Sequence, residues 1–408
     1  MEFLKVDTLE HAREKLHAYA SSYLLRTKDI PLQDALDKTL AEDITALCKI
    51  PAFRRSTVDG YAVQAKDTAA GESIPSFLSQ MGAVEMGVRT SDVLPSGMCV
   101  QVPTGGMVPD GADAVVMAEY TEAFGADGIA VHRSAAPGDN IVQIGEDVQW
   151  GETLLRRGRR LTPRDIGALA AIGLTQVPVY TSPRITILST GDELVPPEAN
   201  PADGEVRDIN SYTLAALAQA HDFSVLHRTL LPDDEALLDT ALRQALANND
   251  IVFVSGGSSQ GEKDKTCDVI QTVATPGVFT QGLALKPGKP TILGYDAPSE
   301  TLLVGLPGHP AAALLVFELL FGWLQRTLRG TPKRPPLPGT LTCKVPGGRG
   351  RLLCHLCTIE RTGTGYAVKP IFSKSGHITG LIEADGYFLL DRNTEGMTQG
   401  QSVLVHLF

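Results

Sequence analysis

At 408 residues and a formal net charge of −11, the chain is long enough for about two to four domains and too acidic to present the basic face that duplex nucleic acid requires. Its longest apolar stretch, residues 311–324, is interrupted by Glu318 and falls short of the ~20 residues that span a bilayer, so no membrane span is predicted. Residues 1–20 lack the apolar centre of a secretory signal, and six cysteines do not suggest a disulfide framework. We therefore expect a cytoplasmic protein with a small ligand.

The first 180 residues combine helical segments with a β-prone region. Apolar residues recur at helical spacing in residues 4–19 and 31–41, and residues 163–172 predict a helix with a proline in its first turn. From about residue 44, short β-prone runs alternate with Gly and Pro. The prediction is a small helical or mixed domain in two pieces, residues 1–45 and 143–180, interrupted by an inserted β-rich domain, residues 46–142.

Strands and helices alternate in the next part of the chain. Runs rich in β-branched residues at 184–189, 223–231, 251–254 and 301–304 each lead towards a helical segment. This alternation predicts a parallel sheet with helices on both faces, whose ligands bind beyond the carboxyl ends of the strands. The fold class is thus α/β plus β, with an α/β domain over residues 181–330. The proline-rich segment 331–338 predicts a stiff linker into a C-terminal β domain, residues 331–408.

Carboxylates gather where these predicted strands end. Glu193 follows the first strand, Asp233 follows the second, and Asp264 lies in the loop after the third. Several carboxylates beside a phosphate suit Mg²⁺, which prefers oxygen ligands. Capping of the next helix is an equally good interpretation of Asp233 and its neighbour Asp234.

Glycines and lysines near the same edge suggest an anion site. The pair Gly256–Gly257 lets backbone N–H groups approach an oxyanion, although a simple turn explains a glycine pair equally well. Lys286 and Lys289 lie on a segment too rich in proline for a helix, and they could hold a phosphate or remain solvated.

Two other patterns favour structure over chemistry. Asp59 and Thr104 lie in glycine-containing segments that indicate turns. Cys354 and Cys357 lack a second paired motif, and alternation along a strand would place them on opposite faces, so zinc is disfavoured.

Eight segments, which occur in one order over almost the whole chain, resemble the signatures of the molybdopterin molybdenumtransferase family. That family includes bacterial MoeA and the E domain of gephyrin. The segments are Ser56-Thr-Val-Asp-Gly-Tyr-Ala, Pro103-Thr-Gly-Gly-Met-Val-Pro, Gly111-Ala-Asp-Ala-Val-Val, Gly145-Glu-Asp, Ser189-Thr-Gly-Asp-Glu-Leu, Ser255-Gly-Gly, Lys286-Pro-Gly-Lys-Pro and Leu306-Pro-Gly.

The resemblance implies an elongated homodimer of four-domain subunits. Its activity would be insertion of molybdate into the dithiolene of adenylylated molybdopterin, with Mg²⁺-dependent release of AMP. A transient contact with the molybdopterin adenylyltransferase would fit this role. The α/β domain would bind the molybdopterin, and the inserted domain of the partner subunit would complete the site.

The resemblance also assigns residues. Asp59, Thr104 and Asp147 would come from the partner subunit, while Glu193, Asp233 and Asp264 would hold Mg²⁺ at the sheet edge. The candidate substrate-binding residues are Ser255, Gly256, Gly257, Ser258, Lys286, Lys289, Pro307, His309, Pro310, Arg351 and Ser375.

Two residues depart from the family pattern close to the expected oxyanion site. His309 and Ala312 stand where the family usually has Asn and Ser, so an amide and a hydroxyl have become an imidazole and a methyl group. A protonated His309 can bind an oxyanion, and a helix-start residue is the alternative. These changes leave two further functions open, a relative that prefers tungstate and a non-catalytic molybdopterin carrier or scaffold.

Overall fold

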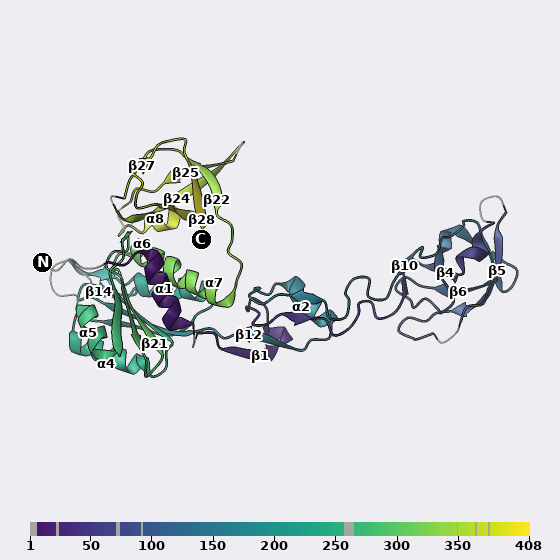
Figure 1. Cartoon of the computed structure of the whole chain (residues 1–408), viewed down its shortest axis with the longest axis horizontal. Coiled ribbons are helices and arrows are strands. Elements are labelled where there is room, and N and C mark those ends of the chain that lie inside the picture. The colour runs from purple at the N-terminus through teal and green to yellow at the C-terminus, as the bar shows by residue number, and fades with distance from the viewer. Residues whose placement is uncertain are drawn as a thin grey trace.

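The computed structural model describes residues 6–21, 24–70, 74–90, 93–256, 265–348, 350–363, 365–373 and 376–408. The molecule is elongated. A β-rich unit lies at one end, an α/β unit and a C-terminal β unit lie together at the other, and a small mixed unit lies between them (Figure 1).

The α/β unit is built on a six-stranded sheet with the strand order β16-β13-β17-β21-β20-β18. The first four strands are parallel, as predicted, and helices α3 and α4 connect β13, β16 and β17 in chain order. At the other edge, β20 runs antiparallel to both of its neighbours, β21 and β18. That edge was not predicted from the sequence. The bounds are β13 Arg184–Thr190, β16 Ser224–Leu231, β17 Ile251–Gly256, β18 Pro276–Gln281, β20 Ile292–Asp296 and β21 Thr301–Leu306.

Helices cover both faces of this sheet and bury two separate cores. One core joins α3, α6 and α7 to the sheet, and the other joins α4 and α5. Helix α1 belongs to the first core through Leu9 and Leu16, so it packs on the α/β unit and not on the small unit. The bounds are α1 Leu9–Ala20, α3 Asn210–Ala220, α4 Glu235–Leu246, α5 Lys265–Val273, α6 Pro310–Phe317 and α7 Trp323–Arg329.

A π-helical turn, η4 (Glu318–Gly322), joins α6 to α7 in one continuous helix, Pro310–Arg329. In the described part of the chain this is the one helix long and apolar enough to cross a membrane. Inside the protein, however, 72% of its most apolar window is buried, and Phe317 and Phe321 pack on the sheet residue Phe253. It therefore has the burial of a central core helix.

The small mixed unit pairs β1 (Thr27–Pro31) with β12 (Gln176–Tyr180) and packs α2 (Pro163–Ala171) on them. The helix predicted for residues 31–41 is wrong: only a short 3₁₀ turn, η1 (Leu32–Asp34), forms there. Ala35 and Leu40 are buried in this core, but they reach it from turns and a bridge to Val179, because Asp37 has a positive φ of 62° that ends any helix.

The inserted β unit holds a six-stranded sheet ordered β7-β4-β6-β5-β9-β8. Two antiparallel chain segments link it to the small unit. We call them the neck, residues 44–56 and 141–155; they pair at β2 with β11 and at β3 with β10. The bounds are β2 Ile44–Thr45, β3 Arg55–Ser56, β4 Gly60–Val63, β5 Ser76–Ala83, β6 Met98–Val102, β7 Ala114–Met117, β8 Thr121–Phe124, β9 Gly128–Val131, β10 Ile141–Val142 and β11 Thr153–Leu155.

The C-terminal unit is a sheet that closes into a barrel because β24 pairs with β26 as well as with β25. Strand β19 (Leu285–Lys286) of the α/β unit adds to β24. Cys354 lies in the core of the α/β unit and Cys357 in that of the barrel, so they occupy opposite faces of β24. The remaining bounds are β22 Leu337–Leu341, β23 Val345–Pro346, β24 Leu352–Thr362, β25 Gly365–Pro370, α8 Thr379–Glu383, β26 Gly386–Leu390, β27 Gly396–Met397 and β28 Ser402–Leu407.

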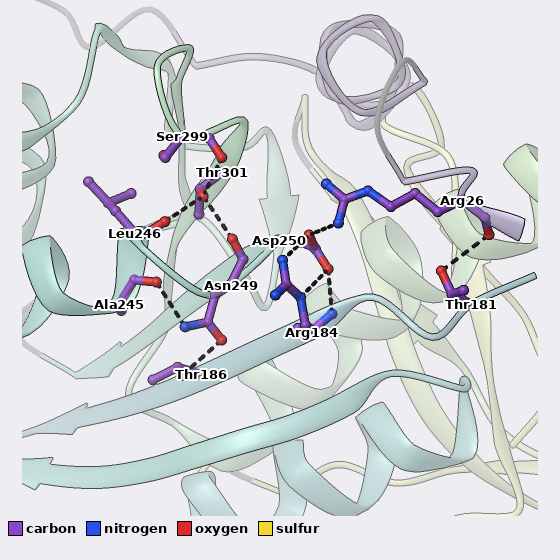
Figure 2. A network of polar contacts seen from close by, with 10 residues as sticks. All are labelled: Arg26, Thr181, Arg184, Thr186, Ala245, Leu246, Asn249, Asp250, Ser299 and Thr301. Atoms are coloured by element: carbon purple, nitrogen blue, oxygen red, sulfur yellow. Dashed lines mark hydrogen bonds and ion pairs between the residues drawn. The ribbon is translucent and has the colours of Figure 1, made fainter. Parts of the chain in front are cut away.

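A polar network fixes the amino ends of the parallel strands (Figure 2). The buried carboxylate of Asp250 accepts hydrogen bonds from the main-chain N–H of Arg184 at 2.7 Å and from the guanidinium of Arg26 at 3.1 Å. Beside it, the hydroxyl of Thr186 donates to the Asn249 side chain at 3.0 Å, and that of Thr301 donates to the Asn249 carbonyl at 2.8 Å. These contacts lock the sheet at the end opposite to the predicted site.

Candidate active site

A cavity of about 690 Å³ opens beyond the carboxyl ends of β13, β17 and β21. This is where parallel α/β sheets bind ligands, and the volume suits a substrate of cofactor size. Six of the predicted site residues line it: Glu193, Ser255, Gly256, Pro307, His309 and Pro310. His309 is the residue that precedes the first turn of α6, so the start of that helix faces the cavity.

Gly256 is required at the end of β17. Its φ is +120°, and a Cβ atom there would overlap the carbonyl oxygen of Thr190 on the neighbouring strand. Gly308, at the end of β21, comes close as well, because a Cβ on it would lie 3.8 Å from the Cα of Gly256. The floor of the cavity is therefore bare main chain, which lets a ligand approach the backbone closely.

Asn210 is a wall residue that the sequence analysis did not assign to the site. Its amide nitrogen donates to the hydroxyl oxygen of Ser255 and to the carbonyl oxygen of Gly308, both at 2.7 Å. It thereby ties the start of α3 to the ends of β17 and β21. Nearby, the Ser189 hydroxyl donates to Asp208, another lining residue, at 3.1 Å. An asparagine opening a helix looks like a cap, so the sequence offered no signal for this role.

Three carboxylates lie together at the edge of the cavity. The pKa of Asp233 is raised from its ordinary value, first by burial and then by the negative charges of Asp192 and Glu193. The main-chain N–H of Asp233 donates to Asp192 at 3.0 Å. Asp234, in contrast, caps α4 by accepting from the N–H groups of Ala236 and Leu237. Of the two adjacent aspartates, Asp234 therefore has the capping role, and the metal-binding role of Asp233 stays a prediction.

Carboxylate oxygens placed in this way could hold a divalent cation, although the positive charge of Lys265 already acts to lower the pKa of Asp233. Within the described ranges no group of three or more His, Cys, Asp or Glu side chains has the arrangement of a complete metal site. Glu193 and Asp233 are two of the three predicted ligands, and Asp264 lies outside the described residues. The predicted residues Gly257, Ser258 and Ser375 also lie outside them.

Lys286, Lys289 and Arg351 lie near the junction of the α/β unit and the barrel, and they are not among the residues that line the cavity. Lys286 pairs with Leu353 in β24, and Arg351 immediately precedes that pairing. The same lysine segment continues to Pro290, which lines the cavity. The barrel also contributes to the wall, because Gly376 lines it and a Cβ there would lie 3.6 Å from the His309 ring.

The remaining three predicted residues lie at the far end of the same chain, in the inserted β unit and the neck (Figure 1). Asp59 and Thr104 are brought together: the N–H and the hydroxyl of Thr104 donate to one Asp59 oxygen at 2.7 and 3.1 Å. Asp147 is exposed in the neck. Within one chain, these residues do not reach the cavity of the α/β unit.

Family models account for nearly the whole chain. Residues 7–173 match the MoeA N-terminal region (domain I and II), residues 186–326 match a probable molybdopterin binding domain, and residues 338–408 match the MoeA C-terminal region (domain IV). The cavity and its carboxylates lie in the second of these regions.

Individual relatives are similar to the chain over the same regions that the family models match. The molybdopterin molybdenumtransferase of Haemophilus influenzae is 31% identical over 406 residues, covering 98% of each chain. That of Bacillus subtilis is 32% identical over 392 residues, covering 93% of this chain and 90% of the relative. A crystal structure of a molybdopterin biosynthesis MoeA protein from Pyrococcus horikosii superposes with a TM-score of 0.87 at 31% identity, covering 99% of each chain.

The fold and the cavity define a multidomain α/β and β protein of molybdenum cofactor biosynthesis, built around a molybdopterin-binding domain. More narrowly, the chain belongs to the MoeA family.

Proposed function

We propose that this protein is a molybdopterin molybdenumtransferase. It inserts molybdate into adenylylated molybdopterin and releases AMP with the help of Mg²⁺. The observation that carries the proposal is the 690 Å³ cavity at the carboxyl ends of β13, β17 and β21, with bare main chain at Gly256 and a carboxylate cluster beside it. Relatives with the molybdenumtransferase name match over almost the full length.

The chain's own residues have separable tasks in this reaction. Gly256 lets a phosphate oxygen approach the main chain at the start of the segment that leads to α5. Glu193, Asp233 and Asp264 would hold Mg²⁺, which supplies positive charge to balance the phosphate oxygens of the adenylate. Lys286 and Lys289 would balance the charge of the incoming molybdate dianion, and Arg351 and Ser375 would complete the pocket. No side chain has to act as a nucleophile. A molybdate oxygen can attack the AMP phosphorus and break its bond to the phosphate oxygen of the pterin, and the two dithiolene sulfurs can then displace AMP and one oxide from molybdenum, with the oxide leaving as water.

A homodimer would complete the site. Asp59, Thr104 and Asp147 lie too far from the cavity of their own chain to act there, so they would serve the cavity of the partner subunit (Figure 1). The neck carries large exposed apolar side chains, Leu47, Phe53, Ile144 and Trp150, as expected of a surface that a second copy covers. A cytoplasmic location and a transient contact with the adenylyltransferase that makes the substrate belong to the same proposal.

The test is AMP release from adenylylated molybdopterin by the purified protein with Mg²⁺, while molybdate and tungstate are titrated in parallel. Molybdate-dependent release that disappears with EDTA is the expected result. Binding of the adenylylated pterin without release under any oxyanion would contradict the proposal and favour a carrier or scaffold.

A second candidate function follows from His309, which faces the cavity at the start of α6, and from Ala312, which is buried in that helix. If these residues set the choice of oxyanion, tungstate would support faster release than molybdate. The double variant His309→Asn with Ala312→Ser would then restore preference for molybdate, and an unchanged preference would exclude this role for the pair.

A further inference from the structure

Two side chains in the cavity wall each contain a buried oxygen without a partner. The hydroxyl of Thr190 and the amide oxygen of Asn210 have no hydrogen-bond partner among the described residues, although both atoms are almost completely buried. Thr190 ends β13 and is only 4% exposed, and both residues line the 690 Å³ cavity. Buried polar atoms are nearly always paired in native proteins, so two unpaired ones in one cavity need an explanation.

The neighbours of Asn210 fix the orientation of its amide. A carbonyl oxygen can only accept, so the group that contacts the Gly308 carbonyl must be the NH₂ of Asn210. The same NH₂ reaches the hydroxyl oxygen of Ser255. The amide oxygen is therefore the atom left over, and it can only accept a hydrogen bond. Because the NH₂ already fills an acceptor position on Ser255, the Ser255 proton remains able to donate elsewhere.

This pattern selects the chemistry of the ligand. A phosphate or molybdate offers acceptors only, so it cannot satisfy the amide oxygen of Asn210. A ring that carries N–H donors beside a carbonyl can do so, and a pterin is such a ring. We propose that Thr190 and Asn210 form the recognition site for the N–H edge of the pterin, a role that rests on the proposed function of this cavity. Thr190, whose hydroxyl both donates and accepts, can pair with either kind of atom on that edge.

According to this proposal, the Thr190 hydroxyl lowers the stability of the free protein and raises its affinity for molybdopterin. Valine has the shape of threonine without the hydroxyl, so Thr190→Val removes a buried polar atom that has no partner in the free protein. Its melting temperature is expected to equal or exceed that of the wild type. Its affinity for metal-free molybdopterin is expected to fall roughly tenfold, the size of one well-placed hydrogen bond.

Thr186 provides a matched control on the same strand. Its hydroxyl is buried and paired with Asn249 at 3.0 Å, at the end of the sheet away from the cavity (Figure 2). Thr186→Val should therefore lower the melting temperature by about 3–6 °C and leave pterin affinity unchanged. The same substitution of Val for Thr on β13 is thus expected to weaken pterin binding at position 190 and to lower the melting temperature at position 186.

The experiment is calorimetric titration of the full-length wild type, Thr190→Val, Thr190→Ser and Thr186→Val with metal-free molybdopterin and, separately, with AMP. The expected result is weaker molybdopterin binding by Thr190→Val, recovery in Thr190→Ser, and unchanged AMP binding. Equal molybdopterin affinity in Thr190→Val and wild type, or a loss confined to AMP, would overturn the assignment. Because binding is read without turnover, absence of molybdenum insertion in the wild type would contradict the proposed function and leave this assignment to be judged on its own.

Discussion

Asp233 and Asp234 are adjacent in sequence and differ in electrostatic environment. Asp234 gives its carboxylate to the first turn of α4, whereas Asp233 lies beside Asp192 and Glu193, where burial and like charge raise its pKa. A raised carboxyl pKa means that the folded state of the metal-free protein resists the negative charge at this position. The Mg²⁺ proposed for this site would remove that conflict.

We expect Asp233→Asn to raise the melting temperature of the metal-free protein at neutral pH. The folded-state pKa of Asp233 lies above its ordinary value of 3.8, so the folded state binds more protons than the unfolded state in the window just above that value. The stability gained from protonation is complete below the ordinary value and is lost as the pH rises through the raised pKa.

Thermal unfolding in EDTA, measured across the acidic range, tests this dependence. The variant and the wild type should converge at the acidic end and diverge towards neutral pH. Asp234→Asn is the control, because asparagine also caps helices and should leave the melting temperature at neutral pH close to that of the wild type. Parallel profiles of wild type and Asp233→Asn would contradict the expectation.

Among single residues, the sequence indicated which carboxylates lie at the edge of the cavity. It did not indicate which distant residues contact one another in the cavity wall. Glu193 and Asp233 were predicted because they follow strands whose carboxyl ends must meet at one edge. Asn210 was not, because its role depends on contacts with Ser255 and Gly308, which are 45 and 98 residues away in the chain. No local pattern records a contact of that range.

The two ends of the parallel strands have different roles, one in stability and the other in ligand binding. Their amino ends carry the network around Asp250 (Figure 2), and their carboxyl ends carry the cavity. Asp250 pairs with Arg184 and Arg26, and its main-chain carbonyl accepts from Leu302 at 3.1 Å. This one residue therefore holds β13, β17 and β21 in register and anchors the chain that leads to β1.

Replacing Asp250 should affect stability alone. We expect Asp250→Ala to lower the free energy of unfolding by about 2–3 kcal/mol, because the N–H of Arg184 loses its buried acceptor. Asp250→Asn keeps an acceptor oxygen, so about 1 kcal/mol is expected. Chemical denaturation measures both. A large change in KM for the adenylylated pterin in the folded Asp250→Asn protein would show that the two ends of the strands are not independent.

A second prediction concerns the close approach of β17 to β13. Gly256→Ala places a methyl group on the carbonyl oxygen of Thr190 at a φ of +120°, so we expect a loss of about 2–4 kcal/mol in unfolding free energy and loss of pterin binding. Gly308→Ala, in the turn after β21, is the matched variant, because the nearest neighbour of its Cβ would be 3.8 Å away. Its melting temperature should match that of the wild type; equal destabilisation of the two variants would contradict the steric explanation.

Whole elements followed from the sequence where local pattern and tertiary packing agree. The buried parallel strands β13, β17 and β21 were predicted because their runs of apolar and β-branched residues are uninterrupted. The prediction of a helix at residues 31–41 was wrong because the apolar residues there reach a small core from turns. The edge strand β18 was missed because it begins with Pro276–Gly277, a pair that indicates a turn and not a strand.

The whole molecule places its two groups of candidate catalytic residues at opposite ends. Asp59 and Thr104 contact each other in the inserted β unit, while Glu193 and Asp233 lie at the rim of the α/β unit (Figure 1). A monomer of this shape cannot bring the two groups together, so the proposed reaction depends on a second copy.

Mixing two inactive variants tests this dependence. Asp59→Ala and Glu193→Ala homodimers should each lose most activity, roughly a hundredfold or more, because each lacks a group that acts on the charge formed in the reaction. After unfolding and refolding together, about half of the dimers would be mixed, and each mixed dimer would contain one intact site, so about a quarter of the wild-type activity should return. No recovery, with mixed dimers shown to form by native mass spectrometry, would mean that each site is built from one chain.

The paired neck has a consequence for how such a protein can change over evolution. Its two segments enter and leave the inserted β unit side by side, joined at Ser56 and Ile141. The inserted β unit between Ser56 and Ile141 can therefore be replaced or altered where these two residues pair, without altering the path of the remaining chain. In the proposed homodimer, a change of sequence there would alter the site of the partner subunit and leave the cavity of its own chain untouched. The two halves of the proposed active site could then vary independently.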